Sequence, residues 1–273
     1  MTNIFRLARS AMFFMKRRRP LVAVSLLLAL GWVVPCVAQA AAADAEVQWA
    51  RVLHRYVNGR GQVDFCGVAN DQPDLRAYVD YIGRVSPENT PAAFPTRDAA
   101  LAYYINSYNA LAMLNVIVSG MPKELGWLTR VWFFGGRRFT IGGKTMTLYT
   151  YENSVIRAMG DERVHFALNC MSIGCPRLPN EPFSDEHLDA QLDEAARHFF
   201  GESRNLQVDP ASHIAWVSSI LKFYKDDFLN RSPTLIAYIN RYAPVKIAPD
   251  TRIEFIPYDW TVNAQGHSCQ PGR

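Results

Sequence analysis

Residues 165–176, HFALNCMSIGCP, combine side chains that can carry out thiol chemistry. A cysteine becomes a good nucleophile when a nearby base or cation favours its thiolate form. An asparagine amide can orient that base or stabilise an oxyanion. The segment therefore offers Cys170 as a candidate nucleophile, His165 as a candidate base and Asn169 as a candidate orienting group.

The same two cysteines can instead close a small loop. Cys170 and Cys175 bracket a turn through Ser172 and Gly174, and such a turn can bring two α-carbons to the roughly 4.4–6.8 Å of a disulfide. The bond would contribute about 2 kcal/mol through chain entropy. A non-catalytic ligand-binding or redox module with a Cys170–Cys175 disulfide is thus the alternative to an enzyme, and both hypotheses stay open here.

Metal and cofactor sites are not predicted. A Cys-x4-Cys pair is a loose match to zinc spacing, and no second Cys or His pair follows at a finger-like distance. The Gly-Gly pairs at residues 135–136 and 142–143 indicate turns, because no phosphate-loop lysine follows them at the required spacing. We expect neither a metal nor a cofactor.

The first 40 residues have the layout of a secretory signal peptide. A basic cluster at residues 16–19 precedes an apolar run at residues 21–34 and an Ala-Gln-Ala site that ends at Ala40. The apolar run is shorter than the roughly 20 residues that span a bilayer, which disfavours a retained anchor. We expect a periplasmic or extracellular protein that keeps Cys66, Cys170, Cys175 and Cys269 after cleavage.

The length and composition of residues 41–273 predict one ordinary globular domain. The chain has 49% hydrophobic residues, and its formal charge of +4 owes much to the basic leader. The mature part is therefore near neutral, and no nucleic-acid partner is expected. No later segment is apolar enough for a stable membrane span. A small-molecule or peptide-like ligand fits this composition, which predicts no particular oligomeric state.

The longest predicted helix follows Thr96 and ends before Gly120. Apolar and aromatic side chains cover most of its circumference, so we expect a central helix that is packed on several sides. Asn106 and Asn109 lie three residues apart on one face of it. Buried amides need partners, so the pair either holds the backbone of a neighbouring loop or forms a polar wall of a site.

Strands are predicted at short apolar runs, several of them bounded by turn residues. In the run at residues 163–169, alternation would place His165 and Asn169 on the face opposite Cys170 unless a turn begins at Asn169. The predicted strands are QVDFCGV, RVWFF, RRFTI, KTMTL, RVHFALN, NLQV and HIAWV.

Amphipathic patterns predict the remaining helices. They cover residues 44–57, 73–85, 184–201, 219–228 and 233–242, with a short helix at YTYENSVIRAMG. The fold class expected is mixed α+β, a single domain with a long central helix packed on a small, mainly antiparallel sheet. A charged pair beside an apolar helix needs compensation when it is buried, so we expect Glu152 and Arg157 to be structural partners.

Six ordered motifs resemble the family catalogued as domain of unknown function 547, over nearly the whole span from Asp98 to Asn263. They are YINSYNAL, YENSVIR, HFALNCMSIGCPRL, LDAQLDEAARHFF, ILKFYKDDF and YDWTVN. Phe223 stands where an indole is common in the family. The family is defined by sequence and has no agreed reaction. The resemblance singles out the residues at the following motif positions as characteristic of the family: Asn106, Tyr108, Asn109, Glu152, Arg157, His165, Asn169, Cys170, Cys175, Pro176, Asp259 and Trp260.

The enzyme hypothesis is a thiol-dependent hydrolase or acyl transferase that acts on a peptide-like or cell-envelope substrate. Cys170, His165 and Asn169 are its catalytic candidates. Ligand binding or loop orientation is expected of the other motif positions, namely Asn106, Tyr108, Asn109, Glu152, Arg157, Asp259 and Trp260.

Overall fold

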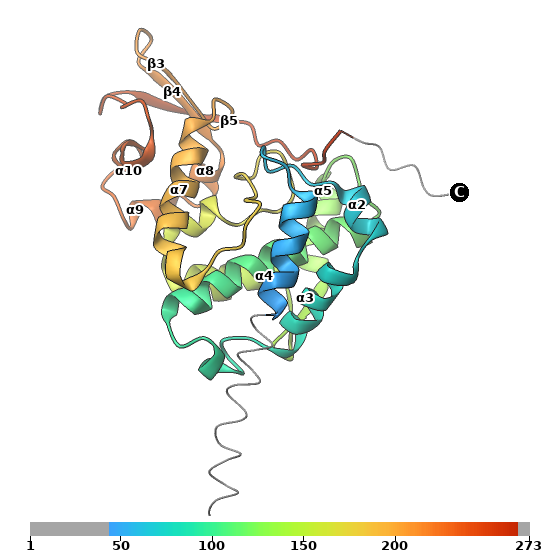
Figure 1. Ribbon diagram of the computed structural model, residues 1–273. Helices are drawn as coiled ribbons and strands as arrows, with labels where there is room; N and C mark the ends of the chain where they lie inside the picture. The colour runs from blue at the N-terminus through green and yellow to red at the C-terminus, as the bar shows by residue number, and fades with distance from the viewer. Residues whose placement is uncertain (1–43, 267–273) are drawn as a thin grey trace, which may run out of the picture.

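Helix α4 (Arg97–Val118) lies in the middle of the fold (Figure 1). The computed structural model describes residues 44–266, so the expected signal peptide and Cys269 lie outside the described residues. The Thr96 side chain caps α4 by accepting a hydrogen bond from the N–H of Ala99, and Gly120 follows its end with a φ of 78°. The buried residues of α4 lie on all sides of the helix, as expected for a central helix.

Helices make the main contacts of α4. Its principal partners are α3 (Pro73–Arg84), α2 (Phe65–Asn70), η3 (Tyr151–Ile156), η6 (Asp185–His187), α6 (Leu148–Thr150) and α7 (Leu188–Gly201). The expectation that α4 packs chiefly on a sheet is therefore wrong. A helix of 22 residues is about 33 Å long, whereas a four-residue strand reaches only about 13 Å. Strands this short cannot cover such a helix.

Two small sheets complete the mixed α+β fold, which confirms the expected class. β1 (Arg138–Ile141) and β2 (Lys144–Thr147) form an antiparallel hairpin whose turn residues Gly142 and Gly143 have φ values of 54° and 79°. In the second sheet β4 (Ile214–Ser218) pairs antiparallel with β3 (Leu206–Asp209) and parallel with β5 (Arg252–Ile256). Among residues 44–266, no helix has the length and apolar character needed to cross a membrane.

Three predicted strands are helical in the structure. QVDFCGV contributes α2, and RVHFALN contributes the 3₁₀ helix η5 (Glu162–Phe166). Each begins at an aspartate whose carboxylate accepts a backbone N–H, Asp64 in the first case and Asp161 in the second. RVWFF lies in a continuous helix formed by α5 (Trp127–Arg130) and the π-helix η2 (Val131–Gly136). Short apolar runs suit either structure, and here the caps and packing selected the helix.

Most other predicted elements are present. A helix spans residues 44–56, and β1 to β4 lie at the four other runs predicted as strands. The segment predicted as a helix at residues 219–228 is divided into α8 (Ile220–Phe223) and α9 (Lys225–Leu229), and α10 (Leu235–Tyr242) follows. The short segments are η1 (Pro91–Ala93), α6 (Leu148–Thr150) and η4 (Arg157–Met159).

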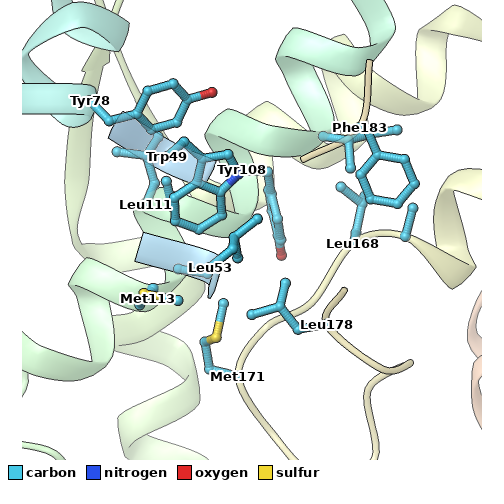
Figure 2. Packing of buried hydrophobic residues seen from close by; sticks show 14 of the residues in the cluster. Trp49, Leu53, Tyr78, Tyr108, Leu111, Met113, Leu168, Met171, Leu178 and Phe183 are labelled. Carbon is cyan, nitrogen blue, oxygen red and sulfur yellow. The ribbon is translucent and has the colours of Figure 1, made fainter. Parts of the chain in front are cut away.

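Two hydrophobic clusters meet at the loop that follows η5. The larger one surrounds α4 and includes Leu168, Met171 and Leu178 from this loop (Figure 2). The smaller one joins α7, β4 and α10 around Phe166. The loop of residues 167–178, which carries both candidate cysteines, is thus anchored in the core.

Candidate thiol site

Asn109 on α4 holds the cysteine loop through backbone hydrogen bonds. Its Nδ2 donates to the carbonyl oxygen of Ala167 at 3.0 Å, and its Oδ1 accepts from the N–H of Asn169 at 2.8 Å. Asn169 then braces the loop from within, because its Nδ2 donates to the carbonyl of Pro176 and its Oδ1 accepts from the N–H of Met171. Met171 adopts a φ of 66°, so these bonds and its complete burial maintain an unfavourable backbone conformation.

Asn106 binds a different segment. Its amide exchanges two hydrogen bonds with the backbone of Phe183, at 2.7 and 3.0 Å. The asparagine pair therefore fixes two loop segments against α4. Neither amide contacts a thiol.

The two cysteines lie side by side as free thiols. Their Sγ atoms are 2.7 Å apart, longer than the roughly 2.05 Å of a disulfide bond. A Cys170–Cys175 disulfide is therefore absent from this structure, whereas Cys66 is disulfide-bonded. Both thiols are buried, with exposed fractions of 8% for Cys170 and 4% for Cys175.

Hydrogen-bond donors converge on the Cys175 sulfur. The N–H of Cys170 donates to it at 3.0 Å, and the hydroxyl of Tyr258 lies 3.1 Å away. Ser172 donates its own hydroxyl to Tyr258 at 3.1 Å, which leaves the Tyr258 proton for the sulfur. The thiol of Cys170 supplies a third donor. The backbone N–H is fixed and serves only Cys175, so it distinguishes the two sulfurs.

The pKa values of the two thiols move in opposite directions. Burial alone raises the pKa of Cys175, but hydrogen bonds from the Cys170 thiol, the Tyr258 hydroxyl and the backbone of Ser172 outweigh it and lower this pKa to about 6. The hydrogen bond to Cys175, together with burial, raises the pKa of Cys170 well above its usual range. The pair is thus arranged to hold a thiolate on Cys175 and a neutral thiol on Cys170.

This thiol pair lines a pocket whose open space, counted together with the solvent at its mouth, is about 450 Å³. The wall is largely aromatic and apolar, with Glu152 and His165 as its charged or titratable side chains besides the thiols and tyrosines. The lining residues are Tyr108, Phe134, Glu152, His165, Leu168, Cys170, Cys175, Pro176, Ile220, Phe223, Tyr224, Tyr258 and Trp260.

His165 is oriented by a carboxylate. Its Nε2 lies 2.8 Å from Oδ2 of Asp227, and its ring stacks on Tyr224 with a centroid distance of 3.7 Å. Arg157 donates two further hydrogen bonds to Asp227, at 2.8 and 2.9 Å. The hydrogen bond with His165, and those from Arg157, keep the pKa of Asp227 well below its usual range.

Glu152 is buried against two phenols. Tyr108 donates to Oε2 at 3.0 Å and Tyr224 donates to Oε1 at 2.5 Å. Burial raises the pKa of both tyrosines well above the usual value, so both remain donors. The expected direct pairing of Glu152 with Arg157 is wrong, because Arg157 forms its ion pair with Asp227, and the two side chains meet only through Tyr224.

The structure thus changes the predicted assignment of roles. No hydrogen bond joins His165 to Cys170, and the Asn169 amide binds loop backbone instead of the imidazole. Trp260 lines the pocket, whereas Asp259 supports the loop by accepting the N–H of Gly174 at its carbonyl oxygen. The described residues contain no group of three His, Cys, Asp or Glu side chains suited to a metal ion.

Sequence reasoning missed four contributors to the site: Ser172, Tyr224, Asp227 and Tyr258. A signal for three of them was present, because FYKDDF and YDW are rich in side chains that can donate, accept or titrate. Tyr224 and Asp227 are also three residues apart, a spacing that places them on one helical face.

Comparison with known proteins gives a match for one segment of this chain, and that match is to a family model. No curated protein and no solved structure gives a significant match to the chain. The motifs ILKFYKDDF and YDWTVN, which supply Tyr224, Asp227 and Tyr258, follow the matched segment in the sequence. Residues 92–200, which include α4, both cysteines and His165, match the model described as "Protein of unknown function, DUF547", and this segment therefore belongs to the family that its motifs resemble.

Proposed function

We propose that this chain is an exported thiol enzyme in which the Cys175 thiolate attacks an acyl carbonyl group. The proposal rests on one observation: the same pocket is lined by two groups that acyl-transfer chemistry requires. One is a cysteine sulfur surrounded by donors, and the other is an imidazole held by a carboxylate. Cys175 replaces Cys170 as the candidate nucleophile.

The Cys175 thiolate requires no base for its formation at neutral pH, because its pKa is about 6. Attack forms a bond between Sγ and the acyl carbon, and the bond to the leaving amine or alcohol breaks. His165 gives the leaving group its proton. It then takes a proton from water, which cleaves the thioester and restores the thiolate.

Asp227 sets the orientation of the imidazole for these proton transfers. With Nε2 bound to the carboxylate, Nδ1 is the nitrogen that gives and takes the proton. Aromatic side chains around the pocket suit a substrate with an apolar portion, and the buried Glu152 suits a polar or cationic group on it. A peptide-like or cell-envelope compound has both features.

A second function is favoured by one specific observation, the 2.7 Å separation of two sulfurs whose pKa values are moved apart. In a dithiol oxidoreductase, Cys175 attacks a substrate disulfide and releases one substrate thiol. Cys170 then attacks the sulfur of Cys175, releases the second thiol and forms an intramolecular disulfide. The substrate disulfide is reduced and the cysteine pair is oxidised.

Two single substitutions separate these functions. With p-nitrophenyl acetate, we expect acylation of Cys175 in wild type and in Cys170→Ser, and none in Cys175→Ser, as read by intact mass and peptide mapping. With an aromatic disulfide reagent, a dithiol enzyme releases both halves of the reagent, whereas its Cys170→Ser variant keeps one half as a mixed disulfide. Acylation that persists in Cys175→Ser, or a wild type that neither retains the acetyl group nor hydrolyses the ester, contradicts the acyl-transfer proposal.

Export is part of the proposal and has its own support. The basic, apolar and small-residue layout of residues 16–40 is that of a signal peptide, and the disulfide at Cys66 is typical of an oxidising compartment. N-terminal sequencing of the protein recovered outside the cytoplasm should begin near residue 41. Retention of Met1 would contradict cleavage.

A further inference from the structure

One short helix concentrates the exposed hydrophobic side chains of this protein. Nine large hydrophobic side chains are exposed in the part of the chain that the structure describes, and four lie within residues 127–132. They are Trp127, Leu128, Val131 and Trp132, with exposed fractions of 67%, 64%, 65% and 59%. Their spacing places them on one side of the continuous helix that α5 and η2 form.

The opposite side of this helix is part of the core. Phe133 is fully buried, and its carbonyl oxygen accepts a hydrogen bond from Asn115 on α4 at 2.9 Å. The ring of Trp132 is also held in place, because it packs directly over Gly136, where any side chain would collide with it. The exposed aromatic surface is therefore held in place by the fold.

Cationic side chains flank these apolar residues. Residues 121–138 contain one acidic residue, Glu124, and four cations, Lys123, Arg130, Arg137 and Arg138. None of the four cations forms an ion pair within residues 44–266. An apolar helix face with two tryptophans and unpaired cations combines the features of a helix that lies in a membrane interface.

We propose that residues 121–138, here called the docking segment, bind this protein to an anionic phospholipid surface. The tryptophans and aliphatic residues enter the boundary between headgroups and acyl chains, and the cations contact lipid phosphates. One face of a helix limited to residues 127–136 is about 15 Å long and about 10 Å wide, which is small beside the roughly 800 Å² that each partner buries in a stable protein complex. Size and charge thus favour a lipid surface over a protein partner.

Docking would bring the membrane close to the thiol pocket. Phe134 from η2 lines that pocket, and its ring packs edge-on against Trp260 with a centroid distance of 6.3 Å. Arg130 lies over the same indole at 4.3 Å. The helix that meets the lipid therefore also forms part of the pocket wall. The proposal concerns binding alone and stands whichever thiol reaction is correct.

The test is flotation with vesicles of phosphatidylcholine alone or mixed with phosphatidylglycerol. We expect wild type to bind the mixed vesicles and to dissociate as the NaCl concentration rises. Val131→Glu should lower the partition coefficient at least about tenfold. The matched control is Val245→Glu, which adds the same charge at a valine of similar exposure, 54%, and should bind as wild type does.

A second pair of substitutions tests the charges. Lys123→Gln and Arg138→Gln should each lower binding to the mixed vesicles about fivefold. All variants are compared as full chains prepared in the same form, and melting curves check that they fold. Absence of wild-type binding, or equal binding by Val131→Glu and Val245→Glu, overturns the proposal. A dimer in sedimentation that Val131→Glu dissociates, without vesicle binding, also overturns it and assigns the surface to a second copy of the chain.

Discussion

Replacement of Tyr258 by phenylalanine tests the origin of the Cys175 thiolate. Tyr258 lies 3.1 Å from the Cys175 sulfur, and burial raises its own pKa well above the usual value, so its hydroxyl remains a donor. Phenylalanine keeps the ring that packs on Trp260 at 4.4 Å. The substitution therefore removes the hydrogen bonds that this hydroxyl forms with Cys175 and Ser172, and it removes little packing.

The expected effect is a rise in the pKa of Cys175. Hydrogen bonds to charged groups contribute about 1.5–3 kcal/mol, and one pKa unit corresponds to about 1.4 kcal/mol. The loss of one donor should therefore move the pKa from about 6 to roughly 7–8. At pH 7 the thiolate population then falls about two- to tenfold.

The measurement is the rate of iodoacetamide alkylation of Cys175 between pH 5 and 9, with mass spectrometry to assign the site. Tyr149→Phe is the control, because this tyrosine is exposed and does not line the pocket of the thiol pair. We expect its midpoint to remain near that of wild type. A wild-type midpoint near 9, or equal midpoints for wild type and Tyr258→Phe, would refute the hydrogen-bond explanation of the lowered pKa.

Three other substitutions probe the supports of the site. Asp227→Asn removes a carboxylate with a lowered folded-state pKa. The stabilisation from that carboxylate is complete above its ordinary pKa of about 4 and is lost as the pH falls. The free energy of unfolding should thus decrease less between about pH 4 and 2 in the variant than in wild type, and parallel denaturation curves would contradict this. In Gly174→Ala, the added Cβ would lie 2.8 Å from the Tyr258 ring, so we expect a loss of about 1–3 kcal/mol and a higher Cys175 pKa. The control Gly201→Ala, with open space around the new Cβ, should show neither change. Asn109→Ala leaves two buried backbone groups without partners and should cost about 2–4 kcal/mol in urea denaturation. Asn115→Ala loses one such bond and should cost about half as much. Equal losses would contradict the explanation that the cost follows the number of hydrogen bonds lost.

The sequence alone determined the elements whose signals are local. Thr96 and Gly120 define the ends of α4, the Gly-Gly turn defines the β1–β2 hairpin, and amphipathic spacing defines α7. The need of buried amides for partners left two roles open for Asn109, and the structure shows the first of them, a hydrogen bond to the backbone of a neighbouring loop. Each of these inferences depends on residues within a few positions of one another, or on the burial that a pattern implies.

Local patterns misassigned residues 163–169, because a short apolar run fits a strand as well as a buried helical turn. The Asp161 cap and packing against α7 stabilise the helical turn η5 at these residues. This changed the site, since the strand model would have placed His165 and Cys170 on opposite faces.

Only the tertiary structure decided which groups control the thiols. Tyr258 reaches Cys175 across 83 positions, and Asp227 reaches His165 across 62. The lowered pKa of Cys175 depends on the close approach of several donors around one buried sulfur. Hydrogen-bond energy changes steeply with distances of a few tenths of an ångström, which residue types and spacings do not specify, so the choice of Cys175 over Cys170 came from the folded arrangement.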